Sequence, residues 1–286
     1  MQHNTQQDEW DWEITNQTSW WDWKLIEVWT YRNLLVRLVR RDFLVNHQQT
    51  LLGPLWMLFQ PLLTLATYVL VFTNIVGIST GNTPPVLFYL VGIILWTFFS
   101  ESFTSVSYTF THNVHIFEKV YFPRLIIPLS VMSANFMRLL LQSSLLVTLI
   151  VYYSLFQNVP IEFNNWLFAA PFCILLIGLN GLSAGLLFAV LTAKYRDLTN
   201  VAVLGIRLMM FVTPVIYSVS IIPANVRWLA ELNPLTPLFE LCRFAVLREG
   251  TFTATSLIYS LSMTTLLFVV AMVFFNKQGD KIMDVI

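Results

Sequence analysis

The stretch from residue 32 to residue 61 reads RNLLVRLVRRDFLVNHQQTLLGPLWMLFQP, and it runs from a basic amphipathic segment almost directly into a long apolar one. At 100° per residue, polar and basic side chains fall within one arc of a helix, and apolar side chains fill the other side. The polar arc consists of Asn33, Arg37, Arg40 and Arg41. Such a helix lies in a membrane interface rather than crossing the membrane. Because Asp42 falls on the apolar side, we expect the helix to end near it, before Asn46.

The composition of the whole chain excludes a soluble domain. Hydrophobic residues make up 56% of the sequence, aromatic residues 15% and charged residues only 11%. A bilayer core needs about 20 mostly apolar residues for each helix that crosses it. Six segments meet that length and predict an all-α membrane protein with spans at 55–78, 86–108, 126–152, 166–191, 199–219 and 254–275. Basic residues are not pooled in one block, so nothing indicates nucleic-acid binding.

Six spans would return the C-terminus to the side of the N-terminus, and most basic residues outside the spans then fall on that shared side. The inner segments hold Lys24, Arg32, Arg37, Arg40, Arg41, Lys119, Arg124, Lys194, Arg196, Lys277 and Lys281. The outer segments hold Arg227, Arg243 and Arg248. Under the positive-inside rule, this distribution predicts a multi-pass protein of the inner (plasma) membrane with both termini in the cytoplasm.

The chain divides into an acidic, Trp-rich extension at 1–24, the interface helix at 25–46 and a six-span domain at 47–286. The extension does not have the basic and then apolar pattern of a cleavable signal peptide. Its tryptophans are expected either to anchor at the lipid headgroups or to pack on a partner. Cys173 lies in a predicted span and Cys242 outside one, so we expect no disulfide framework.

The longest outer connection, residues 220–253, contains Pro223, Pro234 and Pro237, which divide it into two pieces too short to span a membrane. Thr236 can cap a helix that has Pro237 at its first position, and an apolar helix over 237–248 would follow. Helices of this length are typical of re-entrant segments. We therefore expect a re-entrant helical hairpin between spans five and six.

The inner connection at 109–125, TFTHNVHIFEKVYFPRL, mixes charged and aromatic side chains. It is expected either to be a docking surface for another protein or to hold aromatics at the inner membrane interface. His112 and His115 could share a helix face, but no third ligand is near in the sequence, so we predict no metal site.

Three ionisable residues fall inside the predicted spans, namely Glu101, Arg138 and Arg207. Each costs several kcal/mol if it meets lipid alone. Counted from the inner ends of their spans, their heights agree within several Å at about 1.5 Å per residue. We expect a cluster in which Glu101 pairs with Arg138 or Arg207, with the remaining charge facing a polar conduit or a protein interface. A purely structural ion pair is the alternative.

Other patterns concern packing and exclude several classes of protein. Gly178, Gly181 and Gly185 give one helix face that allows close approach of a second helix, within or between protomers. Pro214 removes a backbone hydrogen bond and predicts a kink or hinge. The sequence has no GxxxxGK[ST] phosphate loop, no HExxH, no CxxC and no GxSxG motif, so an enzyme is not indicated. It also has no internal repeat of the kind common in secondary carriers.

The chain resembles the membrane permease subunit of type-2 ABC exporters for lipid-linked polysaccharides such as O-antigen, teichoic acid or capsule. The matching segments cover nearly everything after residue 25, in the expected order. They are LLVRLVRRDFLVNHQQTLLGPLWMLFQPLL at 34–63, IFEKVYFPRLIIPLS at 116–130, AKYRDLTN at 193–200, TPVIYS at 213–218 and NPLTPLFELCRFAVL at 233–247. The extension at 1–24 falls outside the resemblance.

The resemblance implies a homodimer of six-span subunits, bound to two copies of a cytoplasmic ATPase that carries the ATP and Mg. This chain itself would hold no cofactor and would catalyse no reaction. The residues implied to lie at the ATPase contact are Asn113, Phe117, Glu118, Lys119 and Arg124, with Lys194, Arg196 and Asp197 at a second, lesser contact. The helix over 32–42 would lie near the same partner. It joins the first span through 46–53, so we expect it to act as a lever as well as an anchor.

The implied function is ATP-driven export of a lipid-linked glycan, with O-antigen as the favoured substrate. Aromatic side chains suit a sugar conduit, because they stack on the apolar faces of sugar rings. The candidates are Tyr68, Phe72, Tyr89, Trp96, Phe99, Tyr108 and Phe136. The alternative for each is packing or contact with lipid. A permease for teichoic acid, capsule or a small drug or lipid, and a secondary carrier, remain open alternatives for the whole protein.

Overall fold

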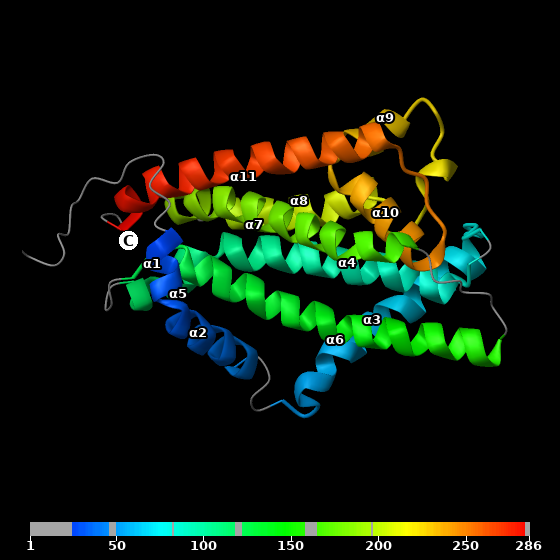
Figure 1. The fold of residues 1–286 in the computed structure, drawn as a ribbon, viewed down its shortest axis with the longest axis horizontal. Helices are drawn as coiled ribbons and strands as arrows, with labels where there is room; N and C mark the ends of the chain where they lie inside the picture. The colour runs from blue at the N-terminus through cyan, green and yellow to red at the C-terminus, as the bar shows by residue number, and fades with distance from the viewer. Residues whose placement is uncertain are drawn as a thin grey trace, which may run out of the picture.

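The computed structural model describes residues 25–45, 50–81, 83–117, 122–157, 165–195 and 197–283, and within them it is built from helices (Figure 1). The long α-helices are α2 (Arg32–Val45), α3 (Trp56–Tyr68), α4 (Pro85–Ser107), α6 (Ile126–Phe156), α7 (Ala170–Lys194), α8 (Leu198–Val212), α10 (Leu235–Leu247) and α11 (Ala254–Met283). The short ones are α1 (Leu25–Thr30), α5 (Thr109–Phe117) and α9 (Arg227–Leu232). A π-helix, Val69–Ile75, continues α3, and 3-10 turns occupy Gly53–Leu55, Asn165–Ala169 and Val219–Ile221.

Five helical segments in the described part are long and apolar enough to cross a membrane, which confirms an all-α multi-pass protein. They cover 53–75, 85–107, 126–156, 165–194 and 254–278. The predicted fifth span, 199–219, is shorter than expected: α8 has 15 residues and ends at Val212. At about 1.5 Å per residue it is roughly 22 Å long, less than the apolar thickness of a bilayer. The count of six spans therefore stays a prediction.

The helix α4 is the central element of the bundle, and α3, α6, α7 and α10 pack around it. Helix α7 approaches α4 closely at two glycines: a Cβ added to Gly181 would lie 3.0 Å from the Ser102 Cβ, and one added to Gly185 would lie 2.7 Å from the Val106 Cβ. The close helix approach predicted for this glycine face thus occurs within the chain. It brings the two most buried spans together.

The amphipathic helix α2 covers Arg32–Val45 and so passes Asp42, near which its end was expected; Asn46 lies outside the described residues. The Asp42 carboxylate is paired with Arg41, whose Nε and Nη2 donate to Oδ1 over 2.8 and 2.6 Å. On the apolar side, Leu38 packs in a cluster with the N-terminal residues of α6. In Figure 1, α1, α5 and the C-terminal part of α11 lie at one end of the bundle, and α9 and α10 lie at the other.

The connection between α8 and α11 contains the expected apolar helix, but its predicted cap is wrong. Helix α10 starts at Leu235, and the Leu235 N–H donates to Asn233 Oδ1 over 3.0 Å. The Thr236 hydroxyl instead donates to the Ala230 carbonyl over 2.6 Å, so it fastens α10 to α9. Asn233 caps the helix instead of Thr236, because its side-chain oxygen can accept a hydrogen bond from the backbone N–H two residues later in the chain. The re-entrant placement of the hairpin stays a prediction.

The two cysteines of the chain are free, buried and in contact. Cys173 of α7 and Cys242 of α10 lie beside each other in the same buried cluster. Their sequence positions, in a span and in the outer connection, had not indicated this proximity. The contact places the middle of α10 directly against α7.

Candidate functional site

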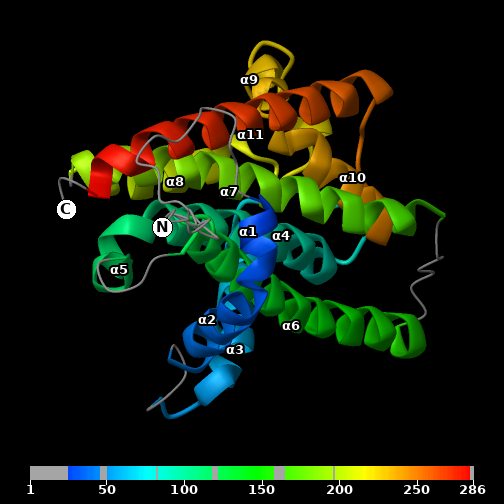
Figure 2. The same cartoon turned by 60° about the vertical axis from the view of Figure 1, so that its left-hand side comes forward.

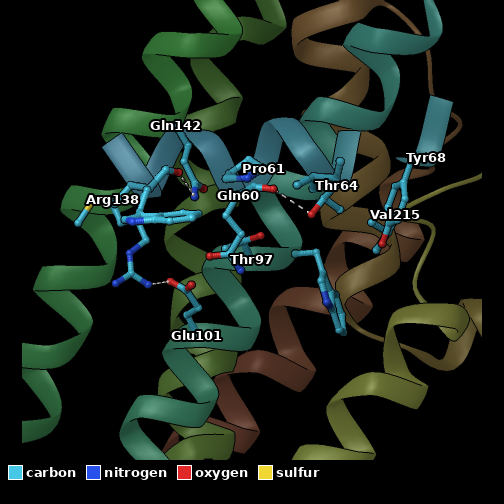
Figure 3. A pocket seen from close by; sticks show the side chains of 13 residues that line it. Gln60, Pro61, Thr64, Tyr68, Thr97, Glu101, Arg138, Gln142 and Val215 are labelled. Atoms are coloured by element: carbon cyan, nitrogen blue, oxygen red, sulfur yellow. Dashed lines mark hydrogen bonds and ion pairs between the residues drawn. The ribbon is translucent and has the colours of Figure 1, made fainter. Parts of the chain in front are cut away.

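A cavity of about 160 Å³ lies where α3 crosses α4 and α6, and it combines polar and aromatic side chains (Figure 3). Its polar lining consists of Gln60 and Thr64 from α3, Thr97 and Glu101 from α4, and Arg138 and Gln142 from α6. Its aromatic lining consists of Trp56, Tyr68 and Trp96. Val215, in the segment that follows α8, also borders it.

A proline in α3 explains how the cavity is held together. Pro61 lies inside the helix and has no N–H, so the carbonyl of Met57, four residues earlier, loses its intrahelical donor. The Gln142 side chain of α6 replaces that donor, with Nε2 donating to the Met57 carbonyl over 3.3 Å. Gln142 is buried, and this bond fixes α3 to α6 at the cavity wall.

Glu101 and Arg138 form an ion pair across the cavity, from α4 to α6 (Figure 3). The structure therefore brings two of the three predicted intramembrane charges together. Arg207 lies elsewhere, exposed on α8, and within the described residues it forms no ion pair with Glu101. The pairing leaves the cavity with hydrogen-bonding groups and no net charge.

The predicted channel aromatics are divided among three environments. Tyr68 and Trp96 line the cavity. Phe72 packs edge-to-face on Tyr68, with ring centroids 5.5 Å apart, whereas Tyr89 and Phe99 are 0% and 3% exposed in the core. The remaining two lie apart from the cavity: Tyr108 stacks on His112 at a centroid distance of 4.7 Å, and Phe136 is exposed on α6 beside Phe98.

The predicted ATPase-contact residues are only partly described. Asn113 breaks the helical geometry of α5 with φ −120° and ψ 18°, and its side chain donates to the Thr109 carbonyl over 3.0 Å. Arg124 is half-buried in the turn before α6, and Asp197 precedes α8. Phe117 is the last residue of α5. Glu118, Lys119 and Arg196 lie outside the described residues.

The basic arc of α2 has the exposure that its pattern predicts. Arg37, Arg40 and Arg41 are all exposed, while the apolar side of the helix faces α6. Whether this arc meets lipid headgroups or a protein stays a prediction. The arc and α5 are both near the N-terminal end of α6, since Ile116 of α5 packs into the same cluster as Leu38.

A second charged pair, Glu240 and Arg243 of α10, was missed at the level of sequence. Both side chains are 1% exposed, and Arg243 Nη1 lies 3.1 Å from Glu240 Oε1. Arg243 also donates to the carbonyls of Pro214 and Val215 over 2.8 and 3.3 Å, and its guanidinium carbon is 4.0 Å from the centroid of the Phe88 ring. The arginine thus holds the segment that follows α8.

Glu240 completes this network from the same helix. Its carboxylate accepts the N–H groups of Val219 and Thr251 over 3.3 and 2.8 Å. Burial raises the pKa of the Glu240 carboxyl, against the opposing effect of Arg243, and burial lowers the pKa of Arg243. The sequence did contain a signal for this ion pair, namely a Glu and an Arg three residues apart in an otherwise apolar segment.

Comparison with known proteins gives the family. Residues 33–247 match the family model of the ABC-2 type transporter. The chain is 30% identical over 216 residues to the O-antigen export system permease protein RfbA of Myxococcus xanthus, covering 74% of this chain and 79% of that one. It is 28% identical over 203 residues to the protein of the same name from Klebsiella pneumoniae, covering 71% and 76%.

A more distant relative carries a less specific name. The inner membrane transport permease YadH of Escherichia coli (strain K12) is 24% identical over 196 residues, covering 66% of this chain and 75% of that one. The matched region includes α2, the cavity between α3, α4 and α6, and the buried pair of α10. With the family model covering most of its length, the chain belongs to the ABC-2 type transporter family.

Proposed function

We propose that this chain is the permease subunit of an ABC exporter that moves lipid-linked O-antigen across the inner membrane. The observation that carries the proposal is the similarity over about three quarters of the chain to permeases named for O-antigen export. Energy would come from ATP and Mg bound by a separate cytoplasmic subunit, as the family and the absence of a phosphate loop in the sequence suggest. Both termini would face that subunit.

The cavity supports a sugar as the transported group. A sugar ring has hydroxyls at its edge and apolar C–H faces, so it needs both hydrogen-bonding and aromatic contacts. Gln60 and Thr64 offer the first, and Tyr68 and Trp96 offer the second. Pairing of Glu101 with Arg138 leaves no free charge to hold a passing neutral sugar tightly. A surface that contacts the sugar without a free charge permits the sugar to move along it as well as to bind.

A homodimer is the second part of the proposal, and α8 supports it. This helix exposes Arg207 together with Leu204, Leu208 and Phe211. An arginine in the middle of an apolar helix costs several kcal/mol against lipid, so a second copy or the conduit beside it would have to cover Arg207. Gly205, whose Cβ position is open to 4 Å, leaves room for a close helix approach on the same helix.

The test is the fate of the glycan in cells that lack this gene. Lipid-linked O-antigen should accumulate inside the cell and disappear from the surface, and the wild-type gene should restore both. Trp96→Ala should restore the complex with the ATPase but only part of the surface glycan, since Trp96 lines the cavity. Leu155→Ala, which alters an exposed side chain of α6 away from the cavity, is the matched control and should restore export fully. Normal surface glycan in the deletion strain would refute the proposal.

A further inference from the structure

A second cavity, of about 280 Å³, is lined by α4, α6, α7 and α10, and its described lining is almost entirely apolar. Its outer wall is formed by α6 from Ser143 to Val151, and α10 contributes its floor with Ala245 and Val246. Helix α6 diverges from α7 toward its C-terminal end in both views of the bundle (Figures 1 and 2). The divergence leaves a groove between them, called here the α6–α10 groove. It is separate from the polar cavity at α3.

The chemistry of the groove excludes water as its occupant. Among the described residues that line it, Ser143 and Cys242 are the only ones with a hydroxyl or thiol, and the others are apolar. An ordered water needs two to four polar partners, which this lining does not provide. The groove also lies between two segments that are long and apolar enough to cross a membrane. Hydrocarbon is the chemistry that fits it.

The groove has the position and length expected for a lipid chain. From Ser143 to Val151, α6 rises about 12 Å at 1.5 Å per residue. One leaflet of the bilayer core is about 15 Å thick. Beyond the groove, the helix ends carry Tyr152, Tyr153 and Trp166, which are typical of the headgroup level. A chain hanging from that level would run along the groove within its own leaflet.

The mouth of the groove fits lipid better than a protein partner. Val147, Val151 and Leu167 at the mouth are exposed and bulky. Helix association in membranes favours small residues and polar groups that bond across the interface. The exposed hydroxyls nearby, those of Ser144 and Thr148, donate to carbonyls of their own helix.

We propose that the α6–α10 groove binds one acyl chain of a bilayer phospholipid from the leaflet nearest α10. The chain would fill the space that α6 leaves open and would support α10 from the membrane side. Because α10 also holds the segment after α8 through Arg243, the bound lipid would stabilise the outer hairpin as a unit. The proposal requires only that the chain lies in a bilayer, and it does not depend on which substrate is exported.

The test uses a phosphatidylethanolamine that carries a diazirine in one acyl chain. The full chain is reconstituted in vesicles of phosphatidylethanolamine and phosphatidylglycerol with this probe, irradiated, and mapped by mass spectrometry. Lipid that only surrounds the protein can reach α6 but not Ala245, which is 3% exposed. We expect cross-links to the Cys242–Val246 stretch of α10 as well as to α6, and competition by excess unlabelled phospholipid.

Two variants that fill the groove and one control separate this binding from general lipid contact. Ser143→Phe and Val246→Phe should reduce the α10 cross-link to background, while Leu155→Phe, outside the groove on the same helix, should leave it unchanged. If a groove variant does not fold, the wild-type chain decides alone, by labelling of the buried Ala245 of α10 in addition to exposed α6. Uniform labelling of α6 with none on α10 would overturn the proposal. So would α10 labelling by an isoprenoid phosphate probe that phospholipid does not compete away.

Discussion

Arg243 of α10 holds together the end of the bundle where α9 and α10 lie. Its guanidinium is buried, and it donates to carbonyls that follow α8, where Pro214 prevents the helix from continuing. Val215 reaches that position because α4 has a glycine there: a Cβ on Gly92 would lie 2.2 Å from the Val215 carbonyl oxygen. The buried guanidinium of Arg243 and the absence of a side chain at Gly92 thus shape the same turn after α8.

Arg243→Met should destabilise the protein strongly. Removing one partner of a buried ion pair typically costs about 3–5 kcal/mol, because the other charge stays buried without its partner. Glu240→Gln combined with Arg243→Met should recover part of that loss, since no unpaired charge remains. The measurement is the thermal unfolding midpoint of the purified protein in detergent. Arg40→Met, at an exposed arginine of α2, is the control and should change the midpoint little. Equal midpoints for all variants would contradict this role.

Glu240 also predicts a dependence of stability on pH. Burial raises the pKa of its carboxyl above the ordinary value of 4.5, so the folded protein binds this proton more tightly than the unfolded chain does. The resulting stabilisation is fully present below pH 4.5 and is lost as the pH rises through the folded pKa. Relative to Glu240→Gln, the wild-type unfolding midpoint should therefore fall as the pH is raised from 4.5. A difference that does not change with pH would show that the carboxyl is not perturbed.

At the scale of the elements, α3 is fastened to α6 by a bond that exists because of a proline. Gln142→Leu should leave the Met57 carbonyl without its donor and cost about 1–3 kcal/mol. Pro61→Ala restores a backbone N–H that can donate to the same carbonyl, so the double variant should be more stable than Gln142→Leu alone. Thermal unfolding of the four proteins gives the coupling energy of the cycle. Additive effects would mean that Pro61 and Gln142 act independently.

Most helices were predictable from the sequence, because their length and composition are visible in it. The exception is α8, which stops at Val212 although apolar residues continue, since backbone geometry at Thr213 and Pro214 decides the end. The α6–α10 groove had no signal, because it arises from the angle between two helices. The heights of Glu101, Arg138 and Arg207 indicated a cluster but not the partner of Glu101. The tertiary packing decides which helices are neighbours, and the height of a residue along its own helix does not reveal this.

For the whole molecule, the order of contacts indicates a route from the end of the bundle that holds α1 and α5 to the cavity. Helix α2 and α5 both pack near the start of α6, through Leu38 and Ile116. Further along α6, Arg138 and Gln142 reach the cavity, where they contact Glu101 of α4 and the Met57 carbonyl of α3. Helix α2 is therefore connected to α3 in two ways, through its packing on α6 and through the chain segment at 46–53. The second way is the lever predicted from the sequence.

Insertion of two glycines after Gln48 tests the connection through the chain segment separately from the connection through α6. It leaves the packing of α2 on α6 unchanged but makes the direct connection to α3 flexible. If α2 acts as a lever, surface glycan should fall while the assembled complex still hydrolyses ATP, because coupling is lost and assembly is not. The same insertion after Gly81, in the connection between α3 and α4 at the opposite end, is the control and should preserve export. Full export with both insertions would mean that α2 is an anchor and that motion reaches the cavity through α6.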